Sequence, residues 1–133
     1  MTTPLILIVE DHRSVRDLLR VVLESEGYRT LEATDGAEAL QAARDRKPDL
    51  VVLDLMMPGV DGEWFIRQML ADKSLLATPV VVVSAKQDAF ETLESLLGLD
   101  NIFPKPFEPE KLISRIEELI GPGQPLPTST WKG

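Results

Sequence analysis

The sequence predicts one α/β domain, built as a doubly wound sheet of five parallel strands with helices on both faces. Three observations support this fold. Short apolar runs alternate five times with segments whose apolar residues recur at helical spacing. Three of the runs are continuous and rich in β-branched residues, as in strands covered on both faces. The 133 residues suffice for one domain with a substantial core.

The predicted strands lie at residues 5–9, 28–33, 50–53, 80–83 and 101–103. The first is an unbroken apolar run. The second alternates, with Arg29 and Glu32 interleaved, so we expect one of its faces to be less buried. The third run is again unbroken, and the fourth consists of four valines. The fifth is short, as expected of a strand at the edge of the sheet.

The predicted helices include residues 15–23, 37–46, 63–71, 88–97 and 109–120. Their apolar residues fall on one helical face each. The first stops at Gly27 and the fourth at Gly98, both normal helix ends. The second follows a turn at Asp35-Gly36 and is ended by Pro48, whereas Pro109 opens the last helix.

The apolar character of the strands predicts their order in the sheet. The first, third and fourth are the most apolar and belong in the centre, while the second and fifth suit the edges. Right-handed crossovers then give the order 2-1-3-4-5, which is flavodoxin-like. A closed barrel of five strands is disfavoured because (βα) barrels need eight units.

The composition changes after the last predicted helix. We expect residues 1–121 to form the domain and residues 122–133, rich in proline and glycine, to form a flexible linker or tail. The chain has no cysteine, no apolar run long enough to span a bilayer and no secretory signal, which predicts a cytoplasmic protein. Its net charge of −8, with no cluster of basic residues, argues against direct binding of nucleic acid.

Chemically active side chains follow the predicted strands. Glu10 and Asp11 come after the first strand, Asp54 after the third and Ser84 after the fourth, while Lys105 follows the fifth. Ligands of open α/β sheets bind outside the carboxyl ends of the strands, so we expect these groups to converge. Three carboxylates in one pocket repel each other unless a cation or shared protons stabilise them. Oxygen ligands without cysteine predict Mg²⁺.

Each residue also has a structural interpretation. Asp11 is suited to cap the following helix, Glu10 to be a solvated acid, Ser84 to be a strand-end hydroxyl and Lys105 to lie on a stiff surface turn between two prolines. Asp54 is the exception because an unpaired acid within apolar sequence is costly to bury. His12, the only histidine, is interpreted mainly as a polar residue at the start of a helix.

The ordered set of motifs resembles the receiver domain of two-component response regulators. The resemblance covers residues 5 to about 120 and rests on VED at 9–11, LDLMMPGVDG at 53–62, VSA at 83–85 and KPF at 105–107. It implies that Asp54 is the phosphoacceptor. It further implies Mg²⁺ ligands at Asp11, Asp54 and the backbone carbonyl of Met56, with Glu10 acting mainly through water. Ser84 then matches the hydroxyl that binds the phosphoryl group.

The resemblance also implies partners. Lys105 matches the charge partner of the phosphoryl group, and the donor is a phosphohistidine on a sensor histidine kinase or a histidine phosphotransfer protein. An output domain or partner is expected at the surface of the fourth helix, fifth strand and fifth helix, which carries Phe90, Lys111 and Arg115. Dimerisation through this surface stays open.

One position departs from the family pattern. The family usually has an aromatic residue three positions before the lysine, but this chain has Ile102 there and Phe103 beside it. Successive strand residues point to opposite faces, which puts the usual aromatic switch in doubt.

Two other functions stay open: a receiver-like interaction module that works without phosphate, and a phosphatase with an aspartyl nucleophile. The phosphatase is disfavoured because such enzymes often carry a second aspartate at the position of Met56.

Overall fold

The computed structural model describes residues 3–54, 62–84, 97–98, 101–104 and 107–124. Its elements are β1 (Leu5–Val9), α1 (Arg13–Ser25), β2 (Arg29–Ala33), α2 (Gly36–Arg46), β3 (Leu50–Asp54), α3 (Gly62–Ala71), β4 (Val80–Ser84), β5 (Ile102–Pro104) and α5 (Pro109–Ile120). The helix predicted at 88–97 lies outside the described residues except for Leu97, which is helical.

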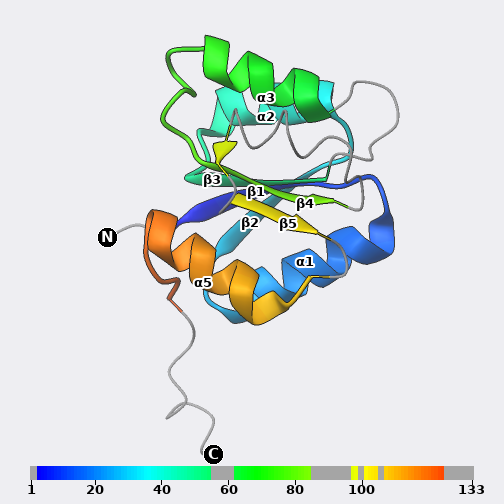
Figure 1. The fold of residues 1–133 in the computed structure, drawn as a ribbon, viewed down its shortest axis with the longest axis vertical. Coiled ribbons are helices and arrows are strands. Elements are labelled where there is room, and N and C mark those ends of the chain that lie inside the picture. The colour runs from blue at the N-terminus through cyan, green and yellow to red at the C-terminus, as the bar shows by residue number, and fades with distance from the viewer. Residues whose placement is uncertain (1–2, 55–61, 85–96, 99–100, 105–106, 125–133) are drawn as a thin grey trace, which may run out of the picture.

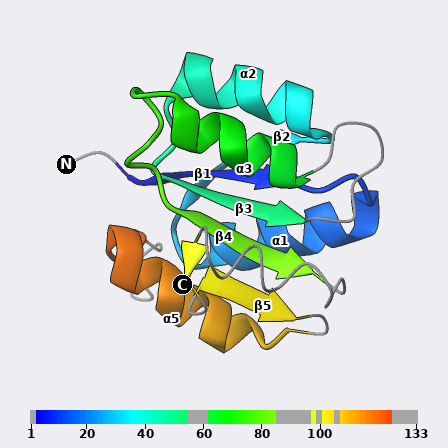
Figure 2. The ribbon, with the colours of Figure 1, turned by 45° about the horizontal axis from the view of Figure 1, so that its top comes forward.

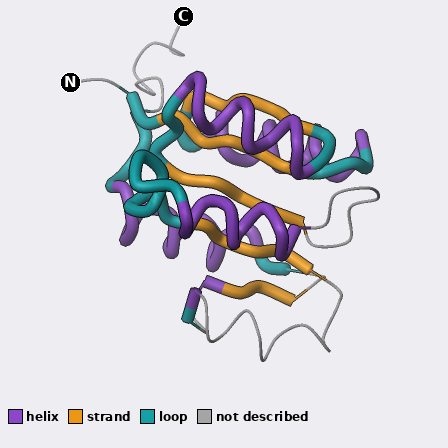
Figure 3. The backbone as a smooth tube through the Cα atoms, turned by 90° about the horizontal axis from the view of Figure 1, so that it is seen from above, coloured by secondary structure: helices purple, strands orange, loops and turns teal. Residues whose placement is uncertain are grey.

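The five strands form one parallel sheet in the order β2-β1-β3-β4-β5, as the apolar pattern predicts. The arrowheads of β1, β3, β4 and β5 point the same way in Figure 2, and the strands run side by side when seen from above in Figure 3. Every residue of β1 and β3 is buried, which explains their unbroken apolar sequences.

Helices cover both faces of the sheet. In Figure 1, α2 and α3 lie above the sheet and α1 and α5 lie below it. Alternate residues of each central strand serve the two cores: Leu7 and Val9 pack with α2 and α3, whereas Ile6 and Ile8 pack with α1 and α5. This alternation confirms the doubly wound α/β fold.

The same alternation divides β5. Ile102 is buried in the core with α2 and α3, whereas Phe103 packs against the core with α1 and α5. The expectation that these neighbours occupy opposite faces is therefore correct.

Local sequence signals account for the helix ends. Gly27 has φ +89° just after α1, a conformation that glycine adopts without strain. The Asp35 side chain caps α2 by accepting a hydrogen bond from the amide of Glu38 at 2.8 Å. At its other end, α2 stops at Lys47 in a left-handed conformation (φ 50°), because the residue before Pro48 is disfavoured in helical geometry.

The segment after α5, residues 121–124, folds back onto the turn between α1 and β2. The Tyr28 hydroxyl donates to the Gly121 carbonyl at 2.7 Å, and the Gln124 amide donates to the Gly27 carbonyl at 3.0 Å. A Cβ on Gly123 would overlap this turn's backbone. The Thr3 hydroxyl also donates to the Gln124 side chain at 3.0 Å. Residues 122–124 of the predicted tail thus pack on the domain, while 125–133 lie outside the described residues.

Candidate functional site

Acidic side chains gather where β1 and β3 end. Val9 pairs with Leu53, so Glu10 and Asp11 leave β1 at the edge of the sheet where Asp54 closes β3. Ligand atoms of Glu10, Asp11, His12 and Asp54 all lie within 4.8 Å of one another. The structure therefore brings together the three acids that the sequence places in one pocket, and it adds a histidine.

Two of these acids are removed from solvent. Glu10 is 0% exposed and Asp54 is 2% exposed, and they are the only buried charged residues in the described part of the chain. Asp11 is partly exposed, but its Oδ1 atom is buried and accepts no hydrogen bond from the described residues. Carboxylates brought this close and shielded from water repel each other strongly, so a cation in their midst is stabilising.

Backbone hydrogen bonds fix the loop between β1 and α1. The Glu10 amide continues the β1–β2 ladder by donating to the Ala33 carbonyl at 3.1 Å. The Glu10 side chain turns back, and its Oε1 accepts from the His12 amide at 3.1 Å. The carboxylate is thereby held toward the end of β3.

Arg16 supports this loop from the first turns of α1. Its Nη1 donates to the carbonyls of Glu10, at 3.0 Å, and Asp11, at 3.4 Å. Its Nε donates to Glu32 at 2.9 Å. Arg16 thus acts on the acids through their backbone. Sequence reasoning missed it, and the only signal available was a basic residue one turn into the helix that follows the acids.

His12 precedes α1 as expected, but its ring contacts the neighbouring acids instead of capping the helix. It occupies the N-cap position with extended backbone geometry and makes no side-chain capping bond. Its Nδ1 lies 3.2 Å from Asp11 Oδ1 and 3.4 Å from Glu10 Oε1. The interpretation of Asp11 as the N-cap is wrong, because the chain enters the helix one residue later.

The remaining predicted site residues are described only in part. Ser84 ends β4 and pairs in register with Pro104, so the backbone leading to Lys105 reaches the same edge of the sheet. Met56, Lys105 and the side chain of Ser84 lie outside the described residues.

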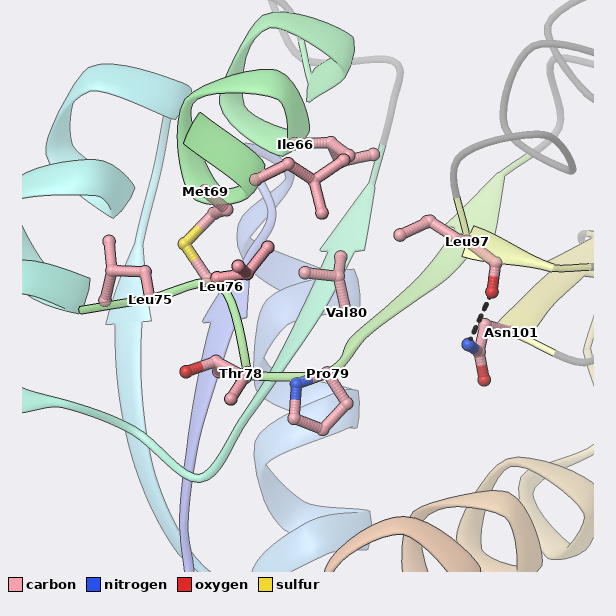
Figure 4. A pocket seen from close by; sticks show the side chains of 11 residues that line it. Ile66, Met69, Leu75, Leu76, Thr78, Pro79, Val80, Leu97 and Asn101 are labelled. Carbon is pink, nitrogen blue, oxygen red and sulfur yellow. Dashed lines mark hydrogen bonds between the residues drawn. The ribbon is translucent and has the colours of Figure 1, made fainter. Parts of the chain in front are cut away.

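A second hollow lies at the opposite edge of the sheet. It is a cavity of about 160 Å³ that opens where β4 and β5 begin, between α3 and the segment leading to Pro79 (Figure 4). Its lining is apolar apart from Thr78 and Asn101. The side-chain amide of Asn101 donates to the Leu97 carbonyl at 2.8 Å. No titratable side chain lines it, so we assign the chemistry to the acidic pocket.

The donor set of the acidic pocket fits a divalent cation. Mg²⁺ prefers carboxylate oxygens and binds through one or two of them together with water. Asp11 and Asp54 supply such oxygens within 4.8 Å of each other, and the buried Asp11 Oδ1 accepts no hydrogen bond from a described residue. The described residues thus fit the predicted ion.

Comparison with known proteins identifies relatives. A family model described as the response regulator receiver domain matches residues 6–117. The DNA-binding response regulator MtrA of Mycobacterium tuberculosis is 40% identical over 112 residues, which are 84% of this chain and 48% of MtrA. The phosphate regulon regulatory protein PhoB of Pseudomonas aeruginosa is 36% identical over 122 residues, which are 89% of this chain and 53% of PhoB. The chain thus spans about half the length of these relatives.

Solved structures share the fold. The receiver domain of the Francisella response regulator 1452 superposes with a TM-score of 0.77 at 32% identity, covering 88% of this chain and 96% of that domain. The receiver domain of the sensor histidine kinase PA1611 from Pseudomonas aeruginosa gives a TM-score of 0.81 at 26% identity, covering 90% and 99% of the two chains. That structure has a magnesium ion coordinated in its active site cleft. In the described part of the present chain, no helix is long and apolar enough to cross a membrane.

Proposed function

The chain belongs to the response regulator receiver domains, which are signalling switches of two-component systems, and from this premise we propose that Asp54 accepts a phosphoryl group from a phosphohistidine. The observation that carries the proposal is the buried carboxylate of Asp54 at the end of β3, gathered with Glu10 and Asp11.

Phosphoryl transfer needs position and charge neutralisation rather than elaborate covalent catalysis. A carboxylate oxygen of Asp54 attacks the phosphorus, an O–P bond forms and the N–P bond to the donor imidazole breaks. The product is an acyl phosphate on Asp54, and the donor imidazole takes a proton from solvent and leaves as the neutral ring. β3 fixes the attacking group, because Asp54 is still held in register with β4 through its pairing with Val83.

The surrounding residues complete the proposed site. Asp11, Asp54 and the carbonyl of Met56 would hold Mg²⁺, with Glu10 acting through water. When bound, this ion neutralises charge on the phosphoryl oxygens. Ser84 donates a hydrogen bond to the phosphoryl group, and Lys105 supplies the opposing charge. Water later attacks the acyl phosphate and releases phosphate.

Intact mass spectrometry tests the assignment. Wild type treated with acetyl phosphate and Mg²⁺ is expected to gain one phosphate, whereas Asp54→Asn gains none because the amide is not a nucleophile. Asp45→Asn, an exposed change on α2, serves as the matched control and is expected to gain phosphate like wild type. Stoichiometric labelling of Asp54→Asn would refute the assignment.

The same experiment separates the two alternative functions, which the family membership does not favour. An interaction module that works without phosphate would stay unmodified as wild type. A phosphatase would turn over acetyl phosphate many times without a stable mass increase.

We further propose that the switch controls an output domain, since relatives twice as long include DNA-binding response regulators. The receiver itself is expected to make no contact with nucleic acid and to work in the cytoplasm with a sensor histidine kinase or histidine phosphotransfer protein. The proposed output surface includes β5 and α5. There, Arg115 ties α5 to the start of β5 by donating to Asn101 at 2.8 Å, and Lys111 stays exposed.

The signal is expected to leave the site by a different route from that of family members with an aromatic switch residue three positions before the lysine. Ile102 is buried on the α2 and α3 side of β5, and Phe103 packs on the α5 side. A signal from Ser84 would therefore reach α5 through Phe103 rather than through an aromatic residue at position 102.

A further inference from the structure

His12 is the one member of the acidic pocket that the proposed phosphoryl chemistry leaves without a role. It is the only histidine of the chain. Its backbone starts α1, but its ring makes no capping bond and instead lies over the carboxylates of Glu10 and Asp11. The imidazole is 67% exposed, so ions in solvent can reach the ring.

The distances around the ring fit ligands that share one metal ion as well as they fit an ion pair. Two ligand atoms each about 2.1 Å from an ion are about 3.0 Å apart at a right angle and about 3.4 Å apart at the tetrahedral angle. His12 Nδ1 lies 3.2 Å from Asp11 Oδ1 and 3.4 Å from Glu10 Oε1. Asp11 Oδ1 is buried and accepts no hydrogen bond from any described residue, and its ion-pair contact within the described part is with His12 Nδ1 itself.

An imidazole changes which ion such a site prefers. Mg²⁺ favours oxygen ligands, whereas Zn²⁺, Co²⁺ and Ni²⁺ bind imidazole nitrogen well and rank above Mn²⁺ for mixed nitrogen and oxygen sites. We propose that His12 Nδ1 joins the carboxylates of Asp11 and Asp54 in a mixed site for a borderline divalent ion, represented by Zn²⁺, which excludes Mg²⁺ from the pocket. This inference rests on the cation centre of the proposed function and extends it to a competing ion.

Binding measurements on the metal-free 133-residue chain test the role of His12. Zn²⁺ affinity is measured by competition with a chromophoric chelator and Mg²⁺ affinity by calorimetry, for wild type and His12→Asn. The asparagine keeps a polar N-cap residue but removes the imidazole. Zn²⁺ binding is expected to weaken on the order of tenfold or more, as for loss of a metal-binding group. Mg²⁺ binding is expected to change little.

Nitrogen NMR gives an independent readout, because a single histidine makes the ring signals unambiguous. The NMR resonance of one ring nitrogen of His12 is expected to shift strongly when Zn²⁺ is added and to stay unchanged when Mg²⁺ is added. Asp54→Asn is expected to weaken the binding of both Zn²⁺ and Mg²⁺, since the Asp54 carboxylate belongs to both proposed sites.

Three results would overturn the inference: a Zn²⁺ affinity unchanged in His12→Asn, an equal loss for both ions, or a ring that does not shift with Zn²⁺. If His12 only donates a hydrogen bond to the acids, its removal strengthens Mg²⁺ binding and does not weaken Zn²⁺ binding. That result also overturns the inference. Failure of wild type to bind Mg²⁺ would instead remove the proposed cation centre, and this inference with it.

Discussion

Arg16 shows how a single side chain positions acids that it does not neutralise. Its guanidinium donates to the carbonyls of Glu10 and Asp11 and to the carboxylate of Glu32. Arg16→Gln is expected to lower the free energy of unfolding by about 1.5–3 kcal/mol, because charged hydrogen bonds are lost in a partly buried setting. Urea unfolding measures this loss. Calorimetry is expected to show weaker Mg²⁺ binding as well, since the loop that carries two acids is no longer held.

Arg20 provides the matched control for that prediction. It also pairs with Glu32, at 3.2 Å, and lies on the same helix, but it contacts no backbone carbonyl of the acidic loop. Arg20→Gln is expected to cost under about 1 kcal/mol, as for exposed ion pairs, and to leave Mg²⁺ binding unchanged. Equal losses of Mg²⁺ affinity in the two variants would show that net charge, rather than loop position, is responsible.

Sequence patterns predicted some site residues and missed others for a physical reason. Glu10, Asp11 and Asp54 were predictable, because they follow apolar strand sequences and strand ends define the ligand edge of a parallel sheet. Arg16 was missed because its targets are carbonyl groups, which every residue carries. The direction of the His12 ring could not be predicted, because it depends on loop geometry and not on spacing.

At the scale of helices and strands, prediction from the sequence succeeded where signals were local. Every described strand and helix lies within two residues of its expected position, since apolar periodicity, glycine and proline mark their limits. The order of the strands also followed from their apolar content. What could not be predicted was the attachment of residues 121–124 to the α1–β2 turn, because it depends on contacts between segments almost a hundred residues apart.

Tyr28 joins the turn between α1 and β2 to Gly121, just after α5, and provides a pH-dependent test of that attachment. Burial raises the pKa of Tyr28 to about 12, assisted by the negative charges of Glu117 and Glu26, while a backbone hydrogen bond from Gly123 acts in the opposite direction. The folded state therefore favours the neutral phenol. Its contribution to stability is fully present below the unfolded pKa of about 10 and is lost as the pH rises through 12.

Tyr28→Phe keeps the buried ring and removes the hydroxyl. At pH 8 the variant is expected to be less stable than wild type by about 1 kcal/mol, since the bond to the Gly121 carbonyl is lost. Urea unfolding between pH 9 and 12 is expected to show this difference shrinking and then reversing. A difference that stays constant over this range would mean that the phenol is not shielded by the segment after α5.

For the whole molecule, the acidic pocket couples cation binding to folding. The chain carries a net charge of −8, and the buried acids repel one another when no cation is present. An ion that binds only the folded state adds RT ln(1 + [L]/Kd), about 1.4 kcal/mol when Mg²⁺ is tenfold above its Kd. We therefore expect Mg²⁺ to raise the melting temperature by a few degrees.

Thermal unfolding in NaCl of matched ionic strength separates this effect from screening of the net charge. The melting temperature of wild type is expected to rise more with Mg²⁺ than with NaCl. In Asp54→Asn most of this additional rise is expected to be lost. Equal gains from the two salts would argue against a specific site in the pocket.

The hydrogen bond between Thr3 and Gln124 has a topological consequence. Two positions separated by 121 residues of chain lie side by side, so a short glycine bridge between them, in a chain shortened to residues 3–124, would convert the fold into a closed ring. Such a cyclised backbone keeps every strand pairing and has fewer unfolded conformations to lose. Cutting it at an exposed turn, such as the one between α3 and β4 where Lys73 and Ser74 are exposed, would give a circular permutant whose five strands keep their spatial order under a different numbering.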